Sequence, residues 1–343
     1  MRNLILGYNK SCCLIAVGVL LALAGSAGAN PPEPSISGPL AAPAFPAALK
    51  SEAAPVWDEP VTITELFDYS YPPLVDSTGA TWHIMSSTGG ENYGSLGWSK
   101  SSCESRDWSP PTMIVSGVDI FAAVIDPQDR ITIATMSGGA KYVIASFRYL
   151  PNEGWHGPVP VWQSAGVTGN FLMGADTDGN VVLVFQHWKD EYNQEWLYTV
   201  YDVKTSQWRE PAACPMAAGE TLATLPILFQ NRNGSHLYYA YRTEIDSVSF
   251  TNELYLHRFD SASLTWGTAE PVPVLAGRPG STSTVSSFLP TVDEAGNMTV
   301  PLNVKFYPPH WPQYGRTSVS FWAIRRENGV WQEPTELPTP QRL

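Results

Sequence analysis

The sequence predicts an all-β protein built from five repeated units of about 50 residues. Three observations predict it: a tryptophan phrase recurs along the chain, a turn phrase recurs in step with it, and short strand-like runs fill the intervals. Two phrases in step are much harder to produce by chance than one. We therefore take the repeat as the basis for the fold.

The first phrase is a Trp followed three residues later by Pro, as in "WREP" at 208–211. Copies start at Trp57 ("WDEP"), Trp108, Trp155 ("WHGP"), Trp208, Trp266 ("WGTAEP", two residues longer) and Trp331 ("WQEP"). An indole in an outer strand can cover the space between neighbouring sheets. Proline suits an edge strand because it cannot donate a ladder hydrogen bond. We expect these tryptophans to be structural.

The second phrase has Asp or Asn at its first position and Gly or Asp at its fourth. It reads "DSTG" from Asp76, "DPQD" from Asp126, "DTDG" from Asp176, "NRNG" from Asn231 and "DEAG" from Asp293. The first side chain can bond its own backbone, and Gly at the fourth position tolerates a positive φ. We expect five tight turns. "DTDGN" lacks the further oxygen ligands and the terminal Glu of a calcium loop, so a turn is predicted there too.

Short β-branched and aromatic runs lie between these marks, and they predict strands. They are "DIFAAVI", "NFLMGA", "TLPILF" and "SSFLPTV" before the turns, "ITIATM", "NVVLVFQ", "SHLYYAY" and "NMTVPLNV" after them, and "KYVIASFRY", "EWLYTVYD", "ELYLHRFD" and "SVSFWAIRR" as third runs. The Trp phrase begins a fourth. Four strands in each of five units predict a single β-propeller with five four-stranded blades. Trp57 is a surplus copy, and we expect its segment beside the blade of Trp331, because rings usually close with strands from both chain ends. A six-bladed ring with one degenerate blade is the alternative.

The N-terminal residues predict export. Arg2 and Lys10 precede an apolar run from Cys12 to Ala24, and Ala27 and Ala29 form a small-x-small cleavage pattern. This is a signal peptide over 1–29, and its apolar run is shorter than the roughly 20 residues of a membrane span. Residues 30–56 are rich in proline and predict a linker. Residues 57–343 then form the propeller of a soluble protein, secreted or periplasmic.

Charge and cysteine content exclude several classes of protein. Removal of Arg2 and Lys10 leaves 18 basic and 32 acidic side chains, a net charge of −14, which disfavours nucleic acid or anionic lipid as a partner. The two remaining cysteines, Cys103 and Cys214, are too few for a disulfide scaffold or a four-cysteine zinc site. We expect different blades to hold them apart and unpaired. The histidines show no metal spacing, and we expect a monomer without cofactor.

Function is predicted at the connections between second and third strands, which share one face and differ among the repeats. Such loops on a rigid scaffold commonly carry binding residues. Two combine aromatic with polar side chains, "HWKDEYNQE" at 187–195 and "YPPHWPQYGRT" at 307–317. The predicted ligand-binding residues are Trp188, Asp190, Glu191, Tyr307, Trp311, Tyr314 and Arg316. A sugar could stack on the rings while its hydroxyls bond the polar groups, so a glycan is the expected ligand.

Two other functions stay open at this point. A glycoside hydrolase would use paired carboxylates, for which Glu65, Glu91, Asp119, Asp190 and Glu191 are candidates. Aromatic loops can equally anchor a protein partner, which would make the chain an interaction scaffold. No nucleophile-elbow, P-loop or dinucleotide motif is present in the sequence.

The repeat rhythm from Trp57 to Trp331 resembles that of sialidase-type and lectin-type propellers. "DSTGATW", from Asp76 to Trp82, is similar to the Asp-box of sialidases. That box places one residue between Asp and Gly, whereas two intervene here, and the cluster of three arginines of a sialidase is absent from the sequence. The resemblance therefore implies the fold, and no catalytic residue is assigned from it.

Overall fold

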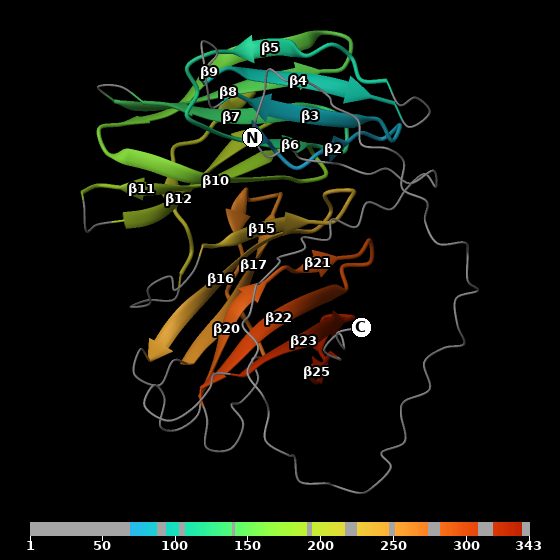
Figure 1. Ribbon diagram of the computed structural model, residues 1–343, viewed down its shortest axis with the longest axis vertical. Helices are drawn as coiled ribbons and strands as arrows, with labels where there is room; N and C mark the ends of the chain where they lie inside the picture. Colours follow the sequence, from blue (N-terminus) through green and yellow to red (C-terminus); the bar gives the residue numbers. More distant parts are fainter. Residues whose placement is uncertain are drawn as a thin grey trace, which may run out of the picture. The chain divides into compact units, whose positions relative to one another are not determined.

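The computed structural model describes residues 69–87, 94–102, 107–138, 141–190, 194–216, 225–246, 251–273, 282–307 and 318–337. Within these ranges every regular element is a strand, and the strands form five antiparallel sheets (Figure 1). All of them belong to the unit Leu66–Leu343. The predicted signal peptide, linker and Trp57 segment lie outside the described residues.

The five sheets follow one another along the chain. Blade 1 holds β1 (Tyr69–Ser70), β2 (Leu74–Val75), β3 (Thr81–Ser86), β4 (Leu96–Ser101) and β5 (Thr112–Val115). Blade 2 holds β6 (Ile120–Ile125), β7 (Ile131–Ser137), β8 (Tyr142–Leu150) and β9 (Gly154–Ser164). Blade 3 holds β10 (Val167–Ala175), β11 (Val181–Trp188), β12 (Gln194–Asp202), β13 (Gln207–Trp208) and β14 (Ala212–Ala213). Blade 4 holds β15 (Ile227–Gln230), β16 (Leu237–Asp246), β17 (Thr251–Asp260), β18 (Thr265–Trp266) and β19 (Glu270–Val272). Blade 5 holds β20 (Thr282–Phe288), β21 (Thr291–Val292), β22 (Met298–Tyr307), β23 (Ser318–Glu327), β24 (Val330–Trp331) and β25 (Thr335–Glu336).

Each sheet has four strand positions, because the additional strands are halves of interrupted ones. In blade 3, β13 and β14 both pair with β12, and in blade 5, β24 and β25 both pair with β23. Pro211 and Pro334 fall in these two breaks. Proline lacks the N–H that the ladder needs, so it interrupts the outer strand where only one neighbour is affected.

The first strands of successive blades lie next to one another. β2 contacts β6, β6 contacts β10, β10 contacts β15, and β15 contacts β21. The second strands are buried on both faces, as in β3, β7 and β11, and the two that belong to blades 2 and 3 lie between neighbouring blades. Five four-position sheets that pack face to face around their first strands form a five-bladed β-propeller, and the predicted fold class is confirmed.

The five predicted turns join first to second strands and share one geometry. The amide of the fourth residue donates to the carbonyl of the first at Gly79, Asp129, Gly179, Gly234 and Gly296. All five of these residues have positive φ, between 60° at Asp129 and 86° at Gly179. The carboxylate of Asp176 accepts a hydrogen bond from the amide of Asn180, 2.8 Å away. The turn phrase thus reflects the chemistry expected from its first and fourth residues.

The phrase tryptophans of blades 2 to 5 each contact the preceding blade. Trp155 lies 6.4 Å from Trp98, and Trp266 lies 6.1 Å from Tyr198, measured between ring centroids. Trp208 Nε1 donates to Ser146 Oγ at 2.9 Å. In the same way, Trp331 Nε1 donates to Glu270 Oε1 at 2.8 Å. The structural role predicted for these indoles is confirmed.

One sequence-based expectation is wrong. The segments 187–195 and 242–252 were expected to be loops, yet β11 runs to Trp188, β16 runs to Asp246, and β17 begins at Thr251. Their aromatic and β-branched content sustains strand pairing beyond the apolar core. Tyr307 is likewise the last residue of β22 and not part of a loop. Within the described ranges, no helix is long and apolar enough to cross a bilayer.

Cys214 is a free cysteine, as expected, while Cys103 lies outside the described residues. Cys214 belongs to the core between blades 3 and 4, where burial raises the pKa of its thiol. Because the thiolate is the reactive form, we expect Cys214 to resist a thiol-specific disulfide reagent in the folded protein and to react on denaturation. A Cys103→Ser variant isolates this thiol, and rapid reaction in its native state would contradict the prediction.

Candidate functional site

The end of blade 3 where the second and third strands connect carries an unusual set of polar side chains. It belongs to the face predicted to bind ligand, because the Asp-type turns occupy the opposite ends of the same strands. Trp188 ends β11 and is partly buried, and Asp190 lies two residues further on and is exposed. Glu191, Trp311, Tyr314 and Arg316 lie outside the described residues. The structure therefore brings two predicted site residues together here, and Tyr307 lies in blade 5.

Three side chains of blade 3 lie side by side across its strands. Thr168 of β10 pairs with His187 of β11, which pairs with Glu195 of β12. Directly paired residues point to the same face of a sheet. That face carries Phe185 two residues earlier and packs on blade 2, so the row faces β9. From β9, Trp162 places its ring edge on the His187 ring, 4.8 Å between centroids at 89°.

His187 bridges a hydroxyl and a carboxylate. Its Nε2 lies 2.9 Å from Ser164 Oγ, at the end of β9, and its Nδ1 lies 3.1 Å from Glu195 Oε1. The other carboxylate oxygen, Oε2, lies 2.9 Å from Lys189 Nζ. The His187 side chain is 8% exposed, whereas that of Glu195 is 30% exposed. The imidazole is thus held from both sides, by two side chains that are each partly exposed.

Opposing effects set the charge state of Glu195. Burial would raise the pKa of this carboxyl, but hydrogen bonds from Lys189 and His187, and the charge of Lys189, outweigh burial and lower it. The group is therefore a carboxylate at neutral pH. A carboxylate on Nδ1 favours the tautomer with its proton on that nitrogen, which leaves Nε2 to accept the Ser164 hydroxyl proton.

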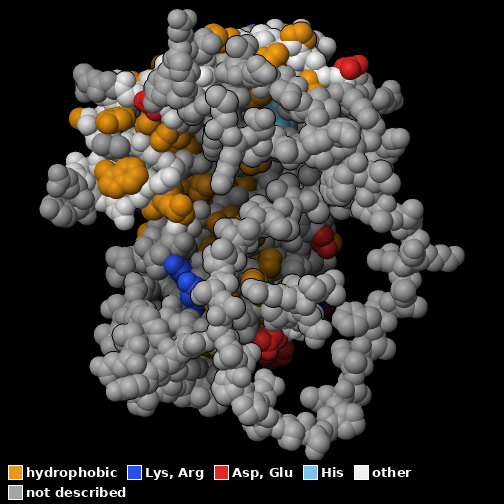
Figure 2. Space-filling model, viewed as in Figure 1, with side chains coloured by type: hydrophobic (Ala, Val, Ile, Leu, Met, Phe, Trp, Pro, Cys, Tyr) orange, Lys and Arg blue, Asp and Glu red, His pale blue; other side chains and the backbone are white. Residues whose placement is uncertain are grey.

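The opposite face of the same strand end carries Trp188 and a chain of amides. Asn170 Nδ2 donates to Gln186 Oε1 at 2.6 Å, and Gln186 Nε2 donates to Gln194 Oε1 at 2.6 Å. Asn170 lies in a bulge of β10 with a φ of 50°, and it is exposed. Bulges commonly redirect a side chain next to a binding site. On the face drawn in Figure 2, hydrophobic side chains gather over the sheets of β6 to β12.

Two glycines allow the close packing of this end. A Cβ on Gly169 would lie 3.2 Å from Trp188 Cζ3 and 3.6 Å from Ile120 Cδ1, so the indole lies against the innermost strand. A Cβ on Gly166 would lie 2.3 Å from the Trp188 carbonyl oxygen and 2.7 Å from His187 Nε2. Any larger residue at 166 would displace backbone or imidazole, which explains glycine at this turn between blades.

The polar row is not a requirement of the repeat. Counted from the start of each second strand, the seventh residue is Ser87, Ser137, His187, Thr243 and Val304 in blades 1 to 5. Ser137 pairs with Val143 in blade 2, where blade 3 pairs His187 with Glu195. Departures from a local rule that the fold does not need are expected at functional sites.

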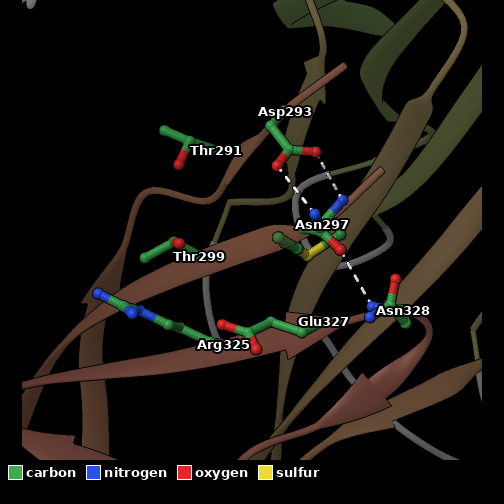
Figure 3. Close-up of a pocket in the computed structure, with 8 residues that line it drawn as sticks. Thr291, Asp293, Asn297, Thr299, Arg325, Glu327 and Asn328 are labelled. Atoms are coloured by element: carbon green, nitrogen blue, oxygen red, sulfur yellow. Dashed lines mark hydrogen bonds between the residues drawn. The ribbon is translucent and has the colours of Figure 1, made fainter. Parts of the chain in front are cut away.

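A hollow of about 300 Å³ lies in blade 5 on the face of the Asp-type turns (Figure 3). Its lining includes the Asp293 turn, Arg325 and Glu327. The sequence predicts structural turns with little room for a site on this face. Both Asn297 donors, the amide and Nδ2, bond the Asp293 carboxylate, and Asn297 Oδ1 accepts from the Asn328 amide.

Blade 3 repeats this arrangement bond for bond. Asn180 donates its amide and Nδ2 to Asp176, and its Oδ1 accepts from the Val203 amide. The polar groups at the centre of the blade 5 hollow therefore hold two turns together, and the corresponding groups of blade 3 do the same. We assign the hollow a structural role and the end of blade 3 the role of candidate site.

Sequence reasoning missed Ser164, Glu195 and Asn170 and treated His187 only as part of an aromatic loop. A signal did exist: on a hairpin over 181–202, His187 and Glu195 come to oppose each other once the register is set. The contribution of Ser164, from the preceding blade, carries no such local signal. Within the described ranges, no group of three or more His, Cys, Asp or Glu side chains is placed to hold a metal ion.

Comparison with known proteins supports the fold. No family model matches the sequence, and no curated protein does. Among solved structures, polysaccharide lyase Uly1 is similar over 80% of this chain and 73% of its own, with a TM-score of 0.51 and 11% identity. A PL25 ulvan lyase gives a TM-score of 0.47 at 11% identity, covering 80% of this chain and 74% of its own. The BP39L lectin from Burkholderia pseudomallei gives 0.43 at 14%, covering 83% and 90%.

Proposed function

We propose that this chain is an exported, monomeric propeller that binds a carbohydrate at the end of blade 3 where the second and third strands connect. The observation that carries the proposal is a partly exposed indole, Trp188, on the same strand-end face as a chain of three amides. Similarity to solved structures at 11–14% identity speaks for the fold alone, so the proposal depends on these side chains.

A sugar ring presents a C–H face and a rim of hydroxyl groups, and this surface offers a partner for each. The indole of Trp188 supplies a flat apolar surface that its packing against Gly169 fixes in place. Asn170 and Gln194, both exposed, end the amide chain with an acceptor, Asn170 Oδ1, and a donor, Gln194 Nε2. Uncharged groups of both kinds suit hydroxyls, which donate and accept.

Charged groups lie at the same strand end, on the other face of β11. Lys189 is 59% exposed and pairs with Glu195, and Asp190 is exposed next to it. Glu191, Trp311, Tyr314 and Arg316 stay ligand-binding residues predicted from the sequence. A binding surface of this kind, with a central aromatic and a polar surround, concentrates its affinity in the aromatic residue.

Glycan-array binding of the mature protein tests the proposal. We expect Trp188→Ala to weaken binding at least about tenfold, equivalent to about 1.4 kcal/mol, because the stacking surface is lost. Trp311→Ala tests the second connection in the same way. Phe321→Ala removes an aromatic side chain that is 43% exposed in blade 5 and serves as control. Absence of binding to any glycan, or equal binding by wild type and both tryptophan variants, would contradict the proposal.

A further inference from the structure

The row of Ser164, His187 and Glu195 has the geometry of a nucleophile, a base and an orienting carboxylate. We propose that Ser164 is a nucleophile for acyl transfer and that the site hydrolyses a carboxylic ester. This inference goes beyond carbohydrate binding and does not depend on it, because the row lies on the other face of β11 from Trp188.

The distances match the roles. Ser164 Oγ and His187 Nε2 are 2.9 Å apart, and His187 Nδ1 and Glu195 Oε1 are 3.1 Å apart. Both fall at the hydrogen-bond separation that activation of a serine by a histidine requires. Such a constellation is recognised by geometry and not by sequence order or fold.

Accessibility and support also fit. The imidazole is buried against Trp162, whereas Ser164 is partly exposed at a turn between blades, so the nucleophile lies nearer to solvent than the base does. The Lys189–Glu195 ion pair fixes the carboxylate from its far side at 2.9 Å. Thr168 Oγ1, buried in the same row, has no hydrogen-bond partner among the described residues, so the row is not a fully satisfied core network.

The chemistry follows from this arrangement. Ser164 Oγ attacks the ester carbonyl carbon while Nε2 takes the hydroxyl proton, and the imidazolium that forms is stabilised by Glu195. The C–O bond to the alcohol then breaks, and Nε2 returns the proton to the departing oxygen. Water, deprotonated by the same nitrogen, releases the acyl group as a carboxylic acid and restores Ser164. The Gly166 amide donates to Ser164 Oγ at 3.0 Å and holds the hydroxyl in position before the attack.

Labelling by a fluorophosphonate probe, mapped by peptide mass spectrometry on the mature protein, tests this assignment. We expect an adduct on Ser164 in the native protein. Ser109 is the matched control, because it is also partly exposed but its hydroxyl accepts from the Lys100 amide at 3.0 Å, and it should remain unmodified. His187→Gln keeps a polar side chain but removes the base, and should slow labelling about 100-fold or more.

Glu195→Gln keeps an oxygen at the same position without its charge, and is the second variant if His187→Gln fails to fold. We expect it to slow both labelling and hydrolysis of p-nitrophenyl acetate at least about tenfold, with an unchanged thermal unfolding midpoint. No adduct on Ser164, or equal labelling of wild type and a folded variant, would overturn the proposal. Glycan binding by the Ser164→Ala variant, measured separately, shows whether carbohydrate binding is independent of ester hydrolysis.

Discussion

Replacement of Phe185 by alanine is expected to lower the free energy of unfolding by about 3–5 kcal/mol. Phe185 is fully buried between blades 2 and 3, with ring centroids 5.3 Å from Trp162 and 6.3 Å from Phe171. Truncation removes apolar area and leaves a cavity that the neighbouring sheets cannot close, because each is held by its own ladder. Urea unfolding followed by tryptophan fluorescence and circular dichroism measures the change.

The control for this prediction is Phe321→Ala, which removes the same side chain from an exposed position in β23. We expect the control to change stability by no more than about 0.5 kcal/mol. A loss below about 1 kcal/mol at Phe185 would contradict the packing described between these two blades.

Acidification from pH 5 to pH 2 is expected to destabilise the wild type by about 2 kcal/mol more than an Asp76→Asn variant. Burial alone would raise the pKa of Asp76, yet hydrogen bonds from Thr78, Lys100, Trp82 and Ala80 outweigh it and lower the pKa from 3.8 to about 2. The side chain is 5% exposed, and Lys100 Nζ lies 2.9 Å from its carboxylate.

The direction follows from proton linkage. Because the folded-state pKa lies below the unfolded-state value, the stabilisation is complete above pH 3.8 and is lost as pH falls towards 2. Each pKa unit corresponds to about 1.4 kcal/mol. Urea unfolding at both pH values, for both proteins, isolates Asp76 from the other acidic groups. Parallel acid sensitivity of the two proteins would show that this carboxylate carries no such stabilisation.

The fold could be predicted because its determinants are local and repeated. A turn needs an acceptor at its first position and a residue that tolerates positive φ at its fourth, and Asp176 and Gly179 satisfy this within four residues. The indole phrase could be interpreted from chemistry alone, since a large side chain on an edge strand has only the neighbouring blade to cover. Trp208, bonded to Ser146, shows this in the structure.

For the candidate site, the sequence predicted the face of the propeller on which it lies but not the residues that form it. Ser164 and His187 meet across 23 residues and two blades, which depends on how far β9 and β11 extend. The position at which a strand ends depends on side-chain packing as well as on turn residues. Turn residues alone therefore predicted a loop at Trp188, whereas β11 continues to that residue. The row beside it follows from strand register, which periodicity alone does not determine.

The tryptophans of the repeated Trp phrase, from Trp155 to Trp331, each contact the blade that precedes their own in the sequence. None of these contacts needs a blade that comes later in the chain. During translation, the ribosome therefore releases every one of these anchors after the surface that receives it. Blades can therefore fold in the order in which they are synthesised, and little apolar surface stays exposed until a distant segment is made.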